Sequence, residues 1–129
     1  MTDREGYDEG LRRRREVLGD EYVDAAFANA DELTKTFQEL VTEQVWSRAW
    51  TGKALDDRTR ALVTLAMLAA LGKFDELEHY AQAAIRVGAS VDDIRDTLVQ
   101  VTAYCGAPAG RQAFFAASRG LHAIGAISK

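Results

Sequence analysis

The fold of this chain is decided by an apolar run of 11 residues, Ala61-Leu-Val-Thr-Leu-Ala-Met-Leu-Ala-Ala-Leu71. Its side chains are apolar at nearly every position, and a helix that is hydrophobic all round is typical of a buried core. The run is too short to span a membrane. We expect Asp56 to open this helix and Gly72-Lys73 to turn the chain into the next one. The run therefore predicts a central buried helix.

The next segment, Asp75-Glu-Leu-Glu-His-Tyr-Ala-Gln-Ala-Ala-Ile-Arg-Val-Gly88, predicts a second helix marked at both ends. Asp75 and Glu78 have the spacing of a capping box, and Gly88 can supply the left-handed residue that ends a helix. The expected inward stripe consists of Leu77, Tyr80, Ala81, Ala84 and Ile85. His79 lies about 100° round the helix from its neighbour Tyr80. We expect the chemistry of the chain to take place here.

The residues before the apolar run indicate three further helices. Residues 1–6 are polar and are expected to form a flexible N-terminus. Helices are predicted for residues 7–18, which stop at Gly19, for residues 22–29, and from Asp31 to about Trp50. The predicted inward stripe of the longest one consists of Phe37, Leu40, Val41, Val45 and Ala49.

The residues after Gly88 predict two more helices. Ser90 and Asp93 have capping-box spacing, and Ile94, Leu98, Val101 and Cys105 form the expected stripe. Gly106-Ala107-Pro108 reads as a turn with proline at a helix start, and the last helix carries Phe114, Phe115 and Leu121. No strand-like alternation occurs. The predicted fold is all-α, with about six to seven helices in one domain over residues 7–129.

Composition sets limits on the class of protein. A chain of 129 residues, 47% hydrophobic with a single proline, suits one helical domain with its own core. The single Cys105 excludes an internal disulfide, a CxxC redox pair and a cysteine-rich zinc site. Without a signal-like segment or a long apolar span, we expect a soluble, cytoplasmic protein. The net charge of −4 gives no reason to expect nucleic acid or a membrane as partner.

Apolar residues are more numerous than a chain of this length can cover. The run Ala61–Leu71 is apolar on every side, and Trp46, Trp50, Phe114 and Phe115 add bulky surface beyond one stripe. Large exposed apolar surface is typical of protein–protein contacts. We therefore predict a homo-oligomer in which subunits can share the walls of an active site.

Two groups of charged residues have alternative interpretations. Four consecutive arginines, Arg12–Arg15, form either a solvated, salt-bridged helix or a site where Arg14 or Arg15 clamps a substrate carboxylate. Glu39, Glu43 and Trp46 are spaced to share one helix face. On this face Glu43 lies either at the exposed rim or buried with a partner.

Several segments in order resemble the γ-carboxymuconolactone decarboxylases, which belong to the alkylhydroperoxidase D-like helical superfamily. The matching segments are Gly10-Leu11, Arg14–Gly19, Gln38–Glu43 with Trp46, Leu65–Leu68, Glu76–Gly88, and Val101–Gly106 with Pro108. They cover the chain from about Tyr7 to Leu121. The resemblance implies an all-α protomer that assembles into a ring-like trimer or hexamer.

The resemblance also implies an activity. Its best-known members decarboxylate 4-carboxymuconolactone to the β-ketoadipate enol-lactone, a step of aromatic breakdown through protocatechuate. The substrate carries its own electron sink, so no metal or organic cofactor is expected. Loss of CO₂ leaves a dienolate, which is then protonated on carbon. The expected partner is thus a small carboxylated lactone or a related molecule.

The residues of the resemblance imply a site. Glu43 matches the glutamate of the family's Glu-x-x-Trp segment, and Arg14 and Arg15 match its paired basic residues. The family histidine, eight residues before the helix-ending glycine, aligns with Tyr80, while His79 comes one residue earlier. Either can be the proton carrier. The implied catalytic residues are Glu43, His79 and Tyr80, and the implied substrate contacts are Arg14, Arg15, Glu39, Trp46, Tyr104 and Cys105.

Three other functions stay open. The first is a divergent enzyme of the same scaffold that acts on another lactone, enol or polyketide-like substrate. The second, a peroxidase, needs an attacking thiolate and a resolving thiol, whereas Cys105 is the only cysteine and is expected to be buried and structural. The third is a non-catalytic oligomeric binding protein in which Glu43 and His79 pair. His122 is expected to be solvated.

Overall fold

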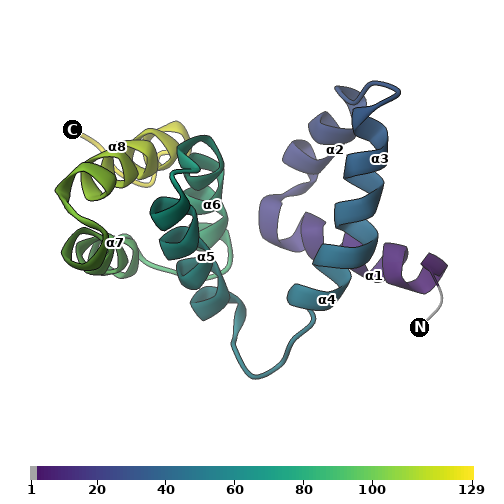
Figure 1. Ribbon diagram of the computed structural model, residues 1–129, viewed down its shortest axis with the longest axis horizontal. Coiled ribbons are helices and arrows are strands. Elements are labelled where there is room, and N and C mark those ends of the chain that lie inside the picture. The colour runs from purple at the N-terminus through teal and green to yellow at the C-terminus, as the bar shows by residue number, and fades with distance from the viewer. Residues whose placement is uncertain (1–2) are drawn as a thin grey trace. The chain divides into compact units, whose positions relative to one another are not determined.

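The computed structural model describes residues 3–129, and over this range the chain contains helices and no strand (Figure 1). The helices are α1 (Asp3–Leu18), α2 (Asp20–Ala28), α3 (Thr34–Leu40), the π-helical η1 (Val41–Trp46), α4 (Ser47–Ala49), α5 (Asp57–Leu71), α6 (Phe74–Arg86), α7 (Val91–Cys105) and α8 (Ala107–Ala123). Because α3, η1 and α4 follow one another without a break, they form one continuous helix, and the described residues contain seven helices counted in this way. The predicted all-α fold is confirmed. No helix among the described residues has the length and apolar character needed to cross a membrane.

The helices group into two compact units, Met1–Leu55 and Asp56–Lys129. Each unit has buried apolar residues of its own. Those of the first include Val17, Val23, Trp46 and Trp50, and those of the second include Leu65, Leu77, Ile94 and Leu98. A single domain over residues 7–129 stays a prediction.

In the N-terminal unit, α1 packs against η1 and α4, and α2 connects it to α3 (Figure 1). Helix α1 begins at Asp3, earlier than the predicted start at Tyr7, and ends at Gly19 (φ 90°) as predicted. An ion pair between Arg4 and Asp8 (3.4 Å), one helical turn apart, accompanies the added turn. Of the segment predicted to be flexible, residues 3–6 thus lie in this helix, and residues 1–2 lie outside the described part of the chain.

The long helix of this unit begins at Thr34, three residues after the predicted start at Asp31, and buries a different face from the predicted one. The Asp31 carboxylate accepts hydrogen bonds from the backbone N–H groups of Leu33 (2.9 Å) and Thr34 (2.8 Å), which confirms it as a cap. The predicted stripe is wrong, because its members Phe37, Leu40 and Val45 are exposed, whereas Thr42 and Trp46 are buried. The π-helical turn of η1 changes the rotation per residue and brings the Thr42 side of the helix against α1.

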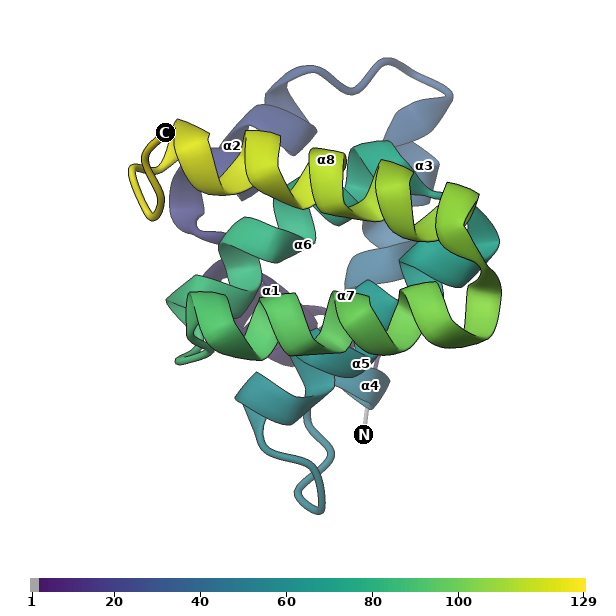
Figure 2. The same cartoon turned by 90° about the vertical axis from the view of Figure 1, so that its left-hand side faces the viewer.

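The C-terminal unit is a four-helix arrangement in which α6 and α7 each pack against both α5 and α8. Figure 2 looks onto α7 and α8, which are joined by the tight turn at Gly106. In α5, the predicted cap Asp56 is confirmed, since its carboxylate accepts from the Thr59 N–H (2.7 Å). The prediction that this helix is buried on every side is wrong, because α5 buries only the side that carries Ala61, Leu65 and Ala69. On its other side Val63, Met67 and Leu71 are exposed.

The ends of α6 and α7 follow the predictions except at two residues. Gly88 is left-handed (φ 104°) beyond the end of α6, and Ser90 and Asp93 form the predicted capping box of α7. The predicted capping box of Asp75 is wrong, because α6 begins at Phe74 and places Asp75 inside its first turn. The predicted burial of Cys105 is also wrong, because this last residue of α7 is exposed.

Candidate functional site

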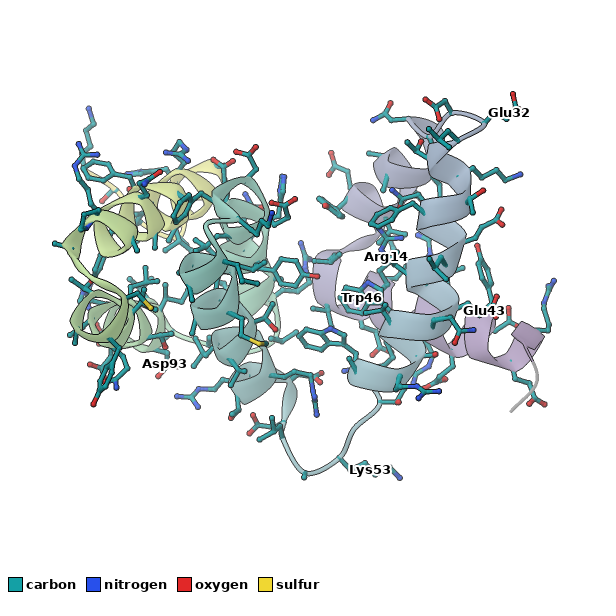
Figure 3. The ribbon with its side chains drawn as sticks, in the orientation of Figure 1. Arg14, Glu32, Glu43, Trp46, Lys53 and Asp93 are labelled. Carbon is teal, nitrogen blue, oxygen red and sulfur yellow. The ribbon has the colours of Figure 1, made fainter. Side chains whose placement is uncertain are left out.

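Arg14 links α1 to the helix that carries Glu43. Its side chain is only 5% exposed. The guanidinium donates to the Gln38 Oε1 atom (Nη2, 2.8 Å) and to the Thr42 hydroxyl (Nη1, 3.2 Å), and it lies over the Phe27 ring with 5.6 Å between its central carbon and the ring centroid. Figure 3 shows Arg14 between α1 and α3. Arg14 therefore joins three helices of the N-terminal unit.

Two other residues of α1 contact the same helix. Gly10, one turn before Arg14, lies so close to η1 that a Cβ atom there would stand 1.8 Å from the Thr42 carbonyl oxygen. Arg13 donates through Nε to the Trp50 carbonyl (2.7 Å), beyond the end of α4. The sequence predictions missed Gly10, Gln38 and Thr42, because each acts through a partner more than twenty positions away in the sequence.

Glu43 lies in η1 and is half-buried. Its Oε1 atom accepts from the side-chain amide of Gln44 (2.8 Å). This position favours the rim interpretation over full burial. π-helical turns inside helices are uncommon and are frequent at functional sites. A carboxylate on such a turn, partly open to solvent, is accessible to a substrate and to protons.

Glu39 and Trp46 have different environments from Glu43, so the predicted shared face is not seen. Glu39 is exposed and pairs with Lys35 (3.8 Å). Trp46 is 4% exposed and stacks on Trp50, with ring centroids 5.1 Å apart and planes 19° apart. Trp46 thus leaves little of its surface for a substrate within this chain.

Arg12, Arg13 and Arg15 of the arginine run form salt bridges, whereas Arg14 is buried. The role of a carboxylate clamp for Arg14 or Arg15 stays a prediction. Arg15 donates to Asp20 (3.1 Å) and to Asp24 (2.8 Å), both exposed. The hydrogen bonds that Arg15 donates to Asp24 and then to Asp20 raise the pKa of its guanidinium. Arg12 pairs with Glu9 and Glu16 at 2.5 and 2.6 Å.

In the C-terminal unit, His79 and Tyr80 are both half-buried on α6. The residues on either side of them are attached to α8. Glu78 pairs with Arg119 (3.3 Å), and Gln82 donates to the Gly120 carbonyl (3.0 Å). These contacts fix the segment of α6 on which the candidate proton carriers lie.

Tyr104 and Cys105 end α7 on open surface, where Tyr104 is 83% exposed. The nine candidate residues divide between the units, with Arg14, Arg15, Glu39, Glu43 and Trp46 in the first and His79, Tyr80, Tyr104 and Cys105 in the second. Convergence of Glu43 with His79 or Tyr80 stays a prediction.

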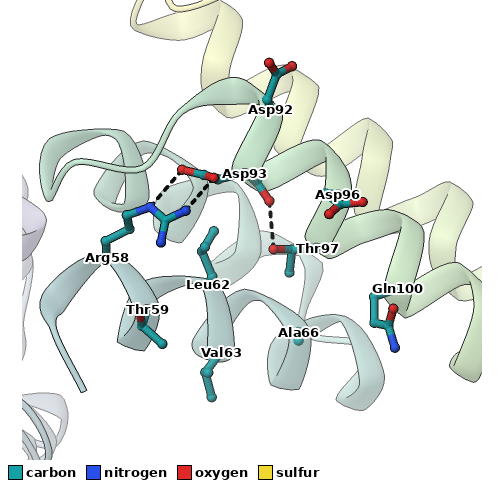
Figure 4. Close-up of a pocket in the computed structure, with 10 residues that line it drawn as sticks. All are labelled: Arg58, Thr59, Leu62, Val63, Ala66, Asp92, Asp93, Asp96, Thr97 and Gln100. Carbon is teal, nitrogen blue, oxygen red and sulfur yellow. Dashed lines mark hydrogen bonds and ion pairs between the residues drawn. The ribbon is translucent and has the colours of Figure 1, made fainter. Parts of the chain in front are cut away.

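A cavity of about 690 Å³ lies between α5 and α7 (Figure 4). Leu62, Val63 and Ala66 form its apolar side. At one end Arg58 donates a bidentate pair of hydrogen bonds to the Asp93 carboxylate (2.9 and 2.5 Å). The Arg58 guanidinium holds the pKa of the Asp93 carboxyl well below its usual range. Asp92 and Asp96 add two further acidic groups to the rim. This negative rim is unsuited to an anionic substrate.

A second cavity, of about 270 Å³, lies between α7 and α8. Its walls include Leu98, Phe114 and Leu121, with Arg95 at the edge. None of the predicted site residues lines either cavity. Over the described range, 3–129, no group of three or more His, Cys, Asp or Glu side chains has the arrangement to hold a metal ion.

Comparison with known proteins relates the Glu43 and His79–Tyr80 segments to one family. The sequence profile of the carboxymuconolactone decarboxylase family matches residues 32–119. The 4-carboxymuconolactone decarboxylase of Acinetobacter baylyi is 34% identical over 113 residues, which cover 88% of this chain and 84% of that protein. The chain belongs to the carboxymuconolactone decarboxylase family. The suspected resemblance is confirmed.

A second relative is also named as a decarboxylase. The nitrosuccinic acid decarboxylase of Metarhizium robertsii is 37% identical over 102 residues, or 79% of this chain and 71% of that protein. The family match at residues 32–119 includes Glu43, His79 and Tyr80, whereas Arg14 and Arg15 precede it.

Proposed function

We propose that this member of the carboxymuconolactone decarboxylase family removes CO₂ from a small dicarboxylic acid whose leaving carboxylate is next to an electron sink. The observation that carries the proposal is the pair of relatives, named for 4-carboxymuconolactone and for nitrosuccinic acid. Both compounds are dicarboxylic acids, and their electron sinks are an unsaturated lactone and a nitro group. The favoured substrate is 4-carboxymuconolactone, in the β-ketoadipate route of aromatic breakdown.

The reaction needs little from the protein apart from placement and one proton. The bond between the carboxylate carbon and its neighbour breaks, and its electron pair moves into the lactone carbonyl or the nitro group. CO₂ leaves, and the resulting dienolate or nitronate takes a proton on carbon. Because the substrate holds the electron sink, the proposed reaction uses no cofactor. A placed acid–base group contributes about 10²–10⁴-fold, and a placed hydrogen-bond donor to the oxyanion about 10²–10³-fold.

In this proposal Glu43 is the acid–base group, and His79 or Tyr80 delivers the proton or donates to the oxyanion. The half-buried position of all three side chains supports these roles, because they keep access to a ligand. Tyr104 and Cys105 are proposed substrate contacts from the exposed end of α7. Glu39 and Trp46 are weaker proposals, since one pairs with Lys35 and the other is buried against Trp50.

The second carboxylate of the substrate requires a basic partner, and we assign it to Arg15 rather than Arg14. Arg15 has two exposed aspartates as partners, and exchanging a surface ion pair for a substrate carboxylate has a small energetic cost. Arg14 would have to leave its hydrogen bonds to the buried Thr42 and the half-buried Gln38. The contacts of Arg14 therefore suit a positioning role.

The proposed enzyme is a homo-oligomer, a trimer or hexamer. Support comes from apolar side chains that the chain itself leaves exposed. On α5 these are Val63, Met67 and Leu71, one turn apart, and on α3 and its N-terminal approach they are Leu33, Phe37 and Leu40. Contiguous exposed apolar surface of this kind is typical of subunit contacts.

The alternative is a divergent enzyme of the same family that acts on another lactone or enol. Its support is Tyr80 at the position of the family histidine, because a phenol is a weaker acid than an imidazolium and suits hydrogen-bond donation to an enolate. Both proposals keep the same acid–base residue and differ in the substrate.

The test is a decarboxylation assay with both named compounds. Loss of 4-carboxymuconolactone is followed by ultraviolet absorbance, and CO₂ release from 2-nitrosuccinate by a coupled assay. The variants are Glu43→Gln, His79→Ala and Tyr80→Phe. We expect wild type to turn over the lactone and Glu43→Gln to lose most activity, while the more damaging of the other two variants identifies the proton carrier. Turnover of neither compound by wild type would reject the proposed substrate class.

A further inference from the structure

We propose that Gly10, Arg14 and Thr42 form a latch that orients Glu43. In this α1 latch, helix α1 holds η1 in its π-helical turn and so sets the direction of the Glu43 carboxylate. Gly10, Arg14 and Thr42 are positioning residues, and none of them needs to touch substrate. The inference rests on the acid–base role proposed for Glu43 and adds the element that keeps this residue in place.

The first observation is the close approach at Gly10. A Cβ atom on this buried residue would lie 1.8 Å from the Thr42 carbonyl oxygen and 3.1 Å from the Ser47 backbone nitrogen. Thr42 lies in η1, and Ser47 is the first residue after it. Only a glycine lets the backbone of α1 rest on both ends of the π-helical turn. Any larger residue at position 10 would have to push η1 away.

The second observation is the hydrogen bonding of the Thr42 side chain, which is fully buried. Its hydroxyl accepts from Arg14 (3.2 Å) and donates to the Gln38 carbonyl oxygen (2.7 Å), one turn back. The Ser47 hydroxyl in the same way donates to the Glu43 carbonyl. Hydroxyl bonds of this kind within a helix bend it locally. Thr42 thus connects the latch on α1 to the backbone of the π-helical turn.

The third observation is the register of the helix. Gln38, Thr42, Trp46 and Trp50 recur every four residues. Arg14 donates to the side chains of Gln38 and Thr42, and Arg13 donates to the backbone carbonyl of Trp50. In a regular α-helix, residues 38 and 50 would point about 120° apart, because each residue turns by ~100°. The π-helical turn of η1 has more residues per turn, so each residue rotates by less than ~100°. This smaller rotation compensates for the difference of about 120° and keeps the four positions on the side that faces α1.

The direction of Glu43 follows from this register. Glu43 comes directly after Thr42, so a return of η1 to regular α-helical geometry would rotate it about the helix axis. A catalytic group misplaced by about 1 Å can cost 10²-fold in rate. The latch is therefore expected to act on the chemical step more than on substrate binding.

The test compares four variants of the full chain. Gly10→Ala introduces the clashing Cβ, and Thr42→Val removes the hydroxyl while keeping the shape of the side chain. Thr42→Ser keeps the hydroxyl and is the conservative rescue. Ser90→Ala removes the cap of α7 in the other unit and controls for general loss of stability. The direct readout is the NMR resonance of the Glu43 carboxyl carbon in protein labelled with ¹³C-glutamate, identified by its disappearance in Glu43→Gln.

We expect Gly10→Ala and Thr42→Val to shift the Glu43 resonance and to lower kcat by about 10–100-fold, with KM changed by less than ~3-fold. Thr42→Ser and Ser90→Ala should leave the resonance and kcat near the wild-type values. An unshifted resonance and an unchanged kcat in Thr42→Val would overturn the latch. If wild type decarboxylates neither compound, the proposed function fails, and the resonance alone decides: a shift in Thr42→Val supports the latch and no shift overturns it.

Discussion

Substitution of the two neighbouring arginines separates a positioning role from a substrate-binding role. Arg14→Met keeps the buried stem and removes the guanidinium, with its hydrogen bonds to Gln38 and Thr42 and its contact with the Phe27 ring. Hydrogen bonds of a charged group contribute about 1.5–3 kcal/mol each, and a cation–π contact about 0.5–2 kcal/mol. The Thr42 hydroxyl keeps its bond to the Gln38 carbonyl, and water can reach the half-buried Gln38 side chain. We therefore expect Arg14→Met to lower the free energy of unfolding by roughly 2–4 kcal/mol.

Arg15→Gln should behave in the opposite way. It removes ion pairs with the exposed Asp20 and Asp24, which contribute little to stability. In the assignment made above it also removes the group that holds the second carboxylate of the substrate, so KM should rise by at least about 10-fold. The measurements are urea unfolding at pH 7 and steady-state kinetics on both variants. Arg14→Met with wild-type stability and a raised KM would refute the assignment and make Arg14 the clamp.

Two further predictions concern acid stability and assembly. The pKa of Asp93 is lowered by its hydrogen bonds from Arg58 and Ser90, so its stabilising effect is complete above its ordinary value of 3.8 and is lost as the pH falls below it. Urea unfolding of wild type and Asp93→Asn from pH 7 to pH 3 should show a stability difference that narrows toward acid, and a difference independent of pH would contradict this. Met67→Asp places a charge on the exposed apolar side of α5 and should dissociate the proposed oligomer. Light scattering measures the mass of both proteins, and a monomeric wild type would contradict the proposed assembly.

The helix ends were predictable from sequence because their causes are local. Asp31, Asp56 and the Ser90–Asp93 pair each bond to a backbone group within three residues. Gly88 likewise ends α6 through its own left-handed conformation. The capping box of Asp75 failed for an equally local reason: α6 starts at Phe74, so Asp75 is already part of the helix.

The buried faces were harder to predict because they depend on distant partners. The stripe expected for the helix after Asp31 assumed 3.6 residues per turn throughout, whereas η1 is π-helical. Its packing against α1 rests on Gly10, and nothing in the local pattern marks that glycine as a contact of Thr42. Cys105 fits an apolar stripe by spacing, yet it is the last residue of α7 and is exposed.

The candidate residues were named from sequence, but their surroundings were not. Glu43 lies on the π-helical turn, and the residue before it in the sequence, Thr42, contacts Gly10 and Arg14 of α1. The anchoring of the His79–Tyr80 segment through Glu78 and Gln82 to α8 was also not foreseen. These contacts join residues 28 to 41 positions apart, and single-sequence periodicity carries no information on them.

We propose above all that this chain is a decarboxylase in which Glu43 performs acid–base chemistry. The most direct measurement is CO₂ release from 4-carboxymuconolactone, and in parallel from 2-nitrosuccinate, by wild type and Glu43→Gln under the same conditions. We expect turnover of at least one compound by wild type and a decrease in rate of about 10²–10⁴-fold in Glu43→Gln, with unchanged stability to urea. Release of CO₂ from neither compound by wild type, or an undiminished rate in Glu43→Gln, would contradict it.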